Sequence, residues 1–73
     1  MAYSPYDIVE YLVALINEFS KKFTLTEAEA YRYIRNHQGL KFANDNYGAL
    51  HTLDINEAVD CVAQICRKNG GAL

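Results

Sequence analysis

At 73 residues the chain is long enough for one domain, since single domains commonly occupy roughly 100–200 residues and two hydrophobic cores do not fit here. The 51% apolar content and the six tyrosines argue for a folded protein and against disorder. A net charge of −2, with acids spread among the basic residues, gives no electrostatic basis for binding nucleic acid or anionic lipid.

We expect neither a membrane-spanning helix nor an export signal in this sequence. Its most apolar run, residues 8–16, is interrupted by Glu10 and is far shorter than the ~20 residues that a membrane-spanning helix needs. No basic and apolar leader precedes Asp7, so we expect no secretory signal. The two cysteines are compatible with a reducing compartment. We therefore expect a cytoplasmic protein that does not associate with membranes.

The first predicted helix covers residues 5–22. Ser4 can cap its free N–H groups, and Pro5 suits the first turn because its missing N–H would have no partner there. Its apolar side chains share one broad arc: Ile8, Val9, Tyr11, Leu12, Leu15, Ile16, Phe19 and Phe23. Tyr6 and Val13 fall outside this arc. An arc this wide predicts a central helix that contacts two neighbours.

The second predicted helix covers residues 27–38. Thr26 followed by Glu29 is a capping box, in which each side chain bonds the other residue's backbone N–H. Gly39 is expected to end the helix in the left-handed conformation. The predicted inward face contains Ala30, Tyr31, Tyr33, Ile34 and His37. Arg32 and Arg35 are expected to point outward.

Two more helices are predicted in the second half of the chain. A short, distorted helix over residues 40–47 keeps Leu40, Ala43 and Tyr47 at helical spacing and ends at Gly48. The last helix, residues 55–68, begins after the cap Asp54 and stops at the run Asn69-Gly70-Gly71. Its apolar face contains Ile55, Ala58, Val59, Val62, Ile65 and Cys66.

These elements predict an all-α fold. No segment of useful length alternates apolar and polar residues with a period of two, so we expect no strands. The predicted architecture is a compact bundle of three main helices plus one short helix. It forms a single domain over residues 1–73, with the first and last helices packed face to face.

The titratable residues form no recognisable reactive motif. Cys61 and Cys66 are five residues apart on one helix, a spacing that fits neither a redox pair nor a metal site. Cys66 is expected in the core and Cys61 at its edge. His37 and His51 lack the closely spaced partner ligands of a structural zinc site. We therefore expect no enzyme activity, no cofactor and no metal.

The segment before the last helix is expected to be a structural turn made by His51, Thr52 and Asp54. The His51 ring can bond a backbone carbonyl there, while Asp54 caps the helix that follows. This reading favours an architectural role for the histidine.

The remaining candidate is a surface for a protein partner, made by Arg32, Arg35, Lys41 and Phe42. Phe42 is expected to face outward, opposite the apolar side of its helix, and aromatic residues with arginine are typical of protein interfaces. Two alternatives remain open. One is a small helix-turn-helix protein that binds nucleic acid through residues 27–47, and the other is a self-associating domain that forms a homodimer.

Three stretches of the chain resemble a known protein family. They are the run Tyr47-Gly48-Ala49-Leu50-His51-Thr52-Leu53-Asp54, the segment from Thr26 to Tyr31, and the helix end from Cys66 to Gly71. Together they resemble a bacterial family of short helical proteins of unknown function, often encoded beside proteins similar to ADP-ribosyltransferase toxins. The resemblance implies an antitoxin or small partner protein of such an enzyme, and it implies no catalytic residues.

Overall fold

A computed structural model describes residues 3–73, and this range contains five helices and no strand. The predicted all-α fold class is confirmed. The helices are α1 (Pro5–Phe23), α2 (Glu27–Asn36), α3 (Gly39–Asp45), α4 (Tyr47–Leu50) and α5 (Ile55–Lys68).

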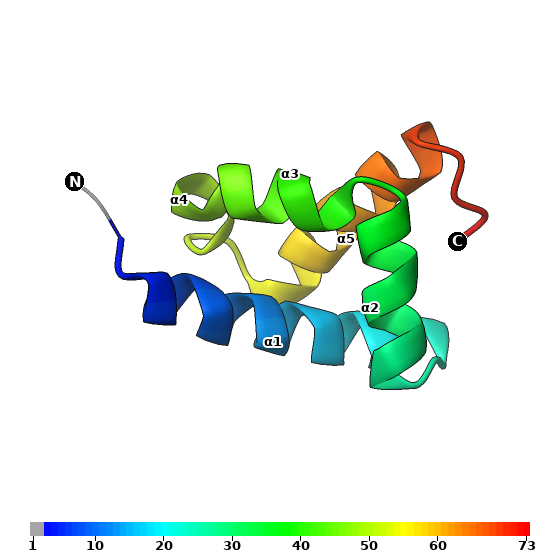
Figure 1. Ribbon diagram of the computed structural model, residues 1–73, viewed down its shortest axis with the longest axis horizontal. Helices are drawn as coiled ribbons and strands as arrows, with labels where there is room; N and C mark the ends of the chain where they lie inside the picture. Colours follow the sequence, from blue (N-terminus) through cyan, green and yellow to red (C-terminus); the bar gives the residue numbers. More distant parts are fainter. Residues whose placement is uncertain (1–2) are drawn as a thin grey trace.

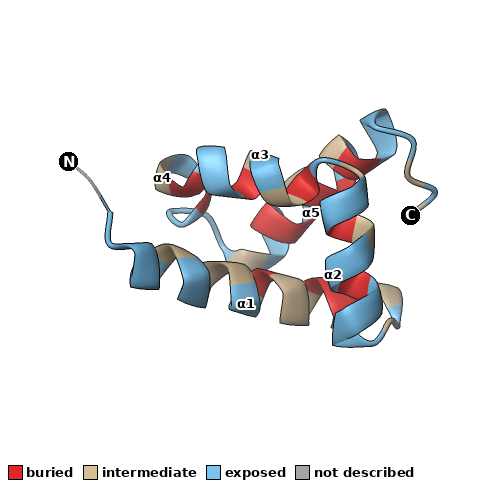
Figure 2. Ribbon diagram, in the orientation of Figure 1, coloured by how far each residue is buried: buried red, intermediate tan, exposed pale blue. Residues whose placement is uncertain are grey.

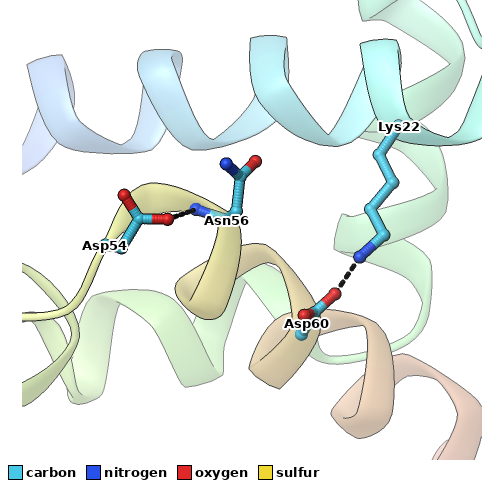
Figure 3. Close-up of polar contacts among 4 residues, drawn as sticks. All are labelled: Lys22, Asp54, Asn56 and Asp60. Carbon is cyan, nitrogen blue, oxygen red and sulfur yellow. Dashed lines mark hydrogen bonds and ion pairs between the residues drawn. The ribbon is translucent and has the colours of Figure 1, made fainter.

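The longest helix, α1, runs along one side of the molecule and contacts α2, α3 and α5 (Figure 1). Helix α2 leads away from the C-terminal end of α1, and α3 and α4 then run back on the opposite side of the molecule. Helix α5 lies behind them in this view. The predicted contact between the first and last helices is present, and an ion pair between Lys22 and Asp60 joins them at the surface (Figure 3).

The core lies where the helices face one another (Figure 2). Phe19 is fully buried on α1, with its ring 4.6 Å from the ring of Phe23 and 5.8 Å from that of Tyr33. Cys66 is buried as predicted, and Cys61 is half-buried. The buried cluster consists of Leu15, Phe19, Ala30, Ile34, Ala43, Leu50, Ala58, Val59, Val62, Ala63 and Cys66.

All three predicted helix caps are present. Ser4 Oγ accepts a hydrogen bond from the backbone N–H of Tyr6 at 3.2 Å, and Asp54 Oδ2 accepts one from Asn56 at 3.1 Å (Figure 3). Thr26 and Glu29 form the reciprocal capping box, with distances of 3.1 Å to Thr26 Oγ1 and 2.8 Å to Glu29 Oε1. These bonds satisfy N–H groups that have no partner inside their helices.

We expect Thr26→Ala to destabilise the protein by about 1 kcal/mol, the usual effect of losing an N-cap side chain. Hydrogen bonds from Thr26 lower the pKa of Glu29. Because the pKa of Glu29 is lower in the folded protein, its ionised carboxylate stabilises the fold. This stabilisation is complete above the ordinary pKa of a glutamate and is lost as the pH falls through the pKa of the folded state. Because Thr26→Ala keeps the backbone N–H that binds Glu29 Oε1, the pH test uses Glu29→Gln. Urea unfolding of this variant and of the wild type should show a smaller difference in stability at acidic pH than at pH 7. An unchanged difference would contradict the role given to Glu29.

The turn between α2 and α3 differs from the prediction. Helix α2 ends at Asn36 rather than residue 38, and Gln38 takes the left-handed conformation expected of Gly39, with a φ of 65°. Gly39 is buried and is the first residue of α3. A β-carbon there would lie 2.8 Å from Cys66 Sγ and 2.9 Å from Ile34 Cγ2. Close packing against α5 and α2, rather than backbone conformation, explains this glycine.

The predicted helix over residues 40–47 is two helices. Helix α3 ends at Asp45, and α4 runs from Tyr47 through Gly48 to Leu50, so the expected stop at Gly48 is wrong. The break lies at Asn46, whose side-chain amide donates to the carbonyl oxygen of Phe42 at 2.9 Å. Asparagine side chains compete with the helix backbone in this way. Helix α1 reaches Phe23, one residue beyond the prediction, and α5 has the predicted bounds.

The segment after α5 folds back against α2. The backbone N–H of Leu73 donates to Tyr33 Oη at 2.9 Å, and His37 Nδ1 lies 3.0 Å from the carbonyl oxygen of Asn69. Gly70 has a φ of 89°, which glycine adopts readily where the chain leaves a helix. The C-terminal residues thus cover one side of α2.

Candidate functional site

A groove of about 390 Å³ lies between α1, α2 and α3. Leu12 of α1 and Leu40 of α3 are its half-buried apolar residues. Arg35 of α2 and Lys41 and Asn44 of α3 supply its polar groups. In Figure 1, α1 and α3 lie on opposite sides of the view, and α2 connects them at one end. The groove therefore combines apolar walls with two cations and an amide.

The two cations of the groove differ in their partners. Lys41 Nζ lies 2.6 Å from Asp45 Oδ2 in an exposed ion pair, and the hydrogen bond to Asp45 raises the pKa of Lys41. The Arg35 guanidinium lies 5.4 Å from the centre of the Tyr31 ring, a cation–π arrangement. Within residues 3–73, Arg35 forms no ion pair. Arg35 is therefore an exposed charge that lies over an aromatic ring and forms no ion pair with a carboxylate of these residues.

An apolar stripe on α1 continues from the groove. This α1 stripe consists of Tyr6, Val9 and Val13, whose exposed fractions are 80%, 57% and 56%. Leu12 of the groove is three residues from Val9, a spacing that makes side chains neighbours on a helix surface. The stripe therefore adjoins the groove through Val9 and Leu12.

Two sequence expectations about α1 and α2 are wrong. Val9 was expected on the inward arc, and Tyr31 on the inward face of α2, yet both side chains are exposed. The apolar surface of α1 is wider than the area that the neighbouring helices cover, so Val9 stays exposed. The Tyr31 ring lies under the Arg35 guanidinium and does not pack into the core. Tyr6 and Val13 are exposed, in agreement with their positions outside the predicted arc.

The structure separates the four residues of the predicted partner surface. Arg35 and Lys41 both line the groove, and Arg32 is exposed on α2 but does not line it. Phe42 was expected to face outward and is instead half-buried against the core. Helix α3 packs on α5 as well as on α2, so the side of α3 opposite the groove is also covered.

The turn residues form a separate local structure. His51 Nδ1 lies 2.8 Å from the carbonyl oxygen of Tyr47, and the His51 ring stacks on the Tyr47 ring at 4.6 Å. Thr52 Oγ1 donates to the carbonyl oxygen of Ala49 at 2.7 Å. With Asp54 capping α5, these bonds hold the connection between α4 and α5.

Leu12, Leu40 and Asn44 were not expected at a functional site. The periodicity of the sequence assigns both leucines to the core, and it gives no sign that their outer edges remain accessible. Nothing in the local sequence marks Asn44 as a residue that lines a groove. A groove between three helices depends on how closely the helices approach, and that information is not local in sequence.

Three structural findings concern the candidate metal ligands, the thiols and the helices of residues 3–73. No group of three or more His, Cys, Asp or Glu side chains in residues 3–73 is placed to hold a metal ion. Burial raises the pKa of the Cys66 thiol, which favours its protonated, poorly nucleophilic form. No helix within this range has the length and apolar character needed to cross a membrane.

Comparison with known proteins gives one family. No curated protein and no solved structure matches the chain significantly. The family model described as "Protein of unknown function (DUF3791)" matches residues 10–69, which include the groove and most of the core. The chain therefore belongs to the DUF3791 family of proteins of unknown function.

Proposed function

We propose that the protein is a non-catalytic module that binds another protein through the α1 stripe and the adjoining groove. The observation that carries this proposal is the exposure of Tyr6, Val9 and Val13 on the same helix that supplies Leu12 to the groove. Contiguous exposed apolar surface with polar groups at its edge is typical of protein interaction sites.

The proposed partner is the product of a neighbouring gene that resembles an ADP-ribosyltransferase toxin. The resemblance of the segments at Thr26–Tyr31 and Tyr47–Asp54 to proteins encoded beside such enzymes supports this choice. In this role the protein would act as an antitoxin, covering the enzyme's site with a helical face. Cytoplasmic location follows from the same proposal, since both proteins would meet where they are made.

The test is co-purification of the tagged protein with the product of its neighbouring gene. We expect Val9→Asp/Val13→Asp to weaken the complex about tenfold or more, because each buried valine contributes roughly 1.5–3 kcal/mol. Binding can be quantified by isothermal titration calorimetry.

The matched control is Ala14→Asp/Gln64→Asp, which adds the same charge at exposed positions outside the stripe. Circular dichroism should show both variants folded. The proposal fails if the wild-type proteins do not associate, or if the stripe variant binds as tightly as the control.

The alternative function is a helix-turn-helix nucleic-acid binder that uses α2 and α3. These helices are joined by a two-residue turn, which is the feature that favours it. Asp45 on the exposed side of α3 weighs against it, because this acid neutralises Lys41 where a phosphate would bind. Electrophoretic mobility shifts at low salt, repeated with Arg32, Arg35 and Lys41 reversed in charge, separate the two functions.

A further inference from the structure

We infer that the groove receives an amphipathic α-helix of the partner protein, which places apolar side chains on Leu12 and Leu40 and a carboxylate on Arg35. This inference rests on the proposed function and specifies the chemistry of the partner. Two observations support it: the shape of the surface, and the charge of Arg35, the groove cation that forms no ion pair within residues 3–73.

The geometry favours a helix as the occupant. Tyr6, Val9 and Val13 repeat at intervals of three and four residues, the spacing by which one helix packs along another. Helix-in-groove binding uses this pattern on both partners. An extended segment would need an exposed sheet edge, and residues 3–73 contain no strand to offer one.

The extent of the surface favours a macromolecular occupant. The groove volume of about 390 Å³ lies at the lower end of the roughly 300–1,000 Å³ typical of small-molecule pockets. The stripe extends the apolar surface beyond it, because Tyr6 lies about 9 Å from Leu12 along the axis of α1. A small ligand would fill the groove and leave the stripe exposed, whereas a helix would cover both.

The charges favour an acidic occupant. Asp45 neutralises Lys41, so the net positive charge of the groove comes from Arg35. The Tyr31 ring supports the guanidinium and limits the freedom it would lose on binding. A planar guanidinium binds a carboxylate through two parallel hydrogen bonds, which makes arginine a specific partner for Asp or Glu.

The experiment uses two synthetic helical peptides of about five turns, roughly 18 residues. In both peptides the leucines follow one another at alternating intervals of three and four residues. The residues beside the leucines are glutamate in one peptide and lysine in the other. Fluorescence anisotropy should show that the glutamate peptide binds the wild-type protein. We expect Arg35→Glu to weaken this binding about tenfold or more and to improve binding of the lysine peptide.

Arg32→Glu is the matched control, since it makes the same change on the same helix outside the groove. It should alter the affinity by no more than about twofold. NMR shifts of the Leu12 and Leu40 methyl groups should accompany binding of the glutamate peptide. The inference is overturned if both arginine variants lose affinity equally, if the lysine peptide binds the wild type as tightly, or if the leucine methyls do not shift.

Two further outcomes separate this inference from the proposed function. If co-purification requires Val9 and Val13 but is unaffected by Arg35→Glu, the protein is a binding module and the acidic helix is rejected. If analytical ultracentrifugation shows a dimer that Val9→Asp/Val13→Asp dissociates, and the glutamate peptide does not compete with it, the surface belongs to a second copy of the chain and the inference fails.

Discussion

We expect Phe19→Ala to lower the free energy of unfolding by about 3–5 kcal/mol, a large part of the stability of a domain this small. The Phe19 side chain has no exposed surface and packs beside Phe23 and Tyr33. Truncating a buried phenylalanine to alanine costs about 3–5 kcal/mol, because apolar contacts are lost and a cavity remains. At roughly 0.05–0.15 kcal/mol per residue, the whole domain has only about 4–11 kcal/mol.

The measurement is urea unfolding followed by circular dichroism. Tyr6→Ala is the control, since it removes an aromatic ring from the same helix at a position that is 80% exposed. We expect this variant to lie within about 0.5 kcal/mol of the wild type. Equal losses in the two variants would show that α1 is not packed through Phe19.

We expect Gly39→Ala to have the second largest effect, a destabilisation of about 1–3 kcal/mol from overpacking. The added β-carbon would lie 2.8 Å from Cys66 Sγ, 2.9 Å from Ile34 Cγ2 and 3.1 Å from Val62 Cγ1. All three neighbours are themselves fully buried and have little room to move. The loss of stability can be measured by the same urea unfolding.

Gly48→Ala is the matched control, because a β-carbon there meets only the Tyr3 ring, at an ordinary 3.4 Å. Since alanine favours helix over glycine by up to about 1 kcal/mol, this variant should be neutral or more stable. Adding Cys66→Ala to Gly39→Ala should remove the closest clash. The double variant should therefore lose less stability than the sum of the two single variants, by about 0.5 kcal/mol or more. Strict additivity would contradict the close approach of α3 and α5.

The prediction that Gly39 ends α2 in the left-handed conformation is wrong because of a contact between distant residues. Glycine after a helical run usually signals a left-handed stop, and the backbone does reverse at this point. The left-handed residue is Gln38, however, and Gly39 is small because Cys66, from a distant part of the chain, packs against it. Sequence order alone does not contain that contact.

The candidate site was predicted in part for a related reason. Arg35 and Lys41 were expected on the surface, and both line the groove. Phe42 was expected beside them, but α3 packs on two helices and covers it. Val9 was expected to be buried and is exposed, because periodicity gives the direction of a side chain but not whether a neighbouring helix reaches it.

The helical class and the three helix starts at Ser4, Thr26 and Asp54 follow from the amino-acid sequence alone. These features depend on residues within one turn of each other, so composition and spacing contain them. Two other features become visible only in the folded chain: the part of the apolar arc of α1 that is covered, and the meeting of Leu12, Arg35 and Leu40 in one groove. Those outcomes depend on the distances between helices, which side chains far apart in sequence set when they pack.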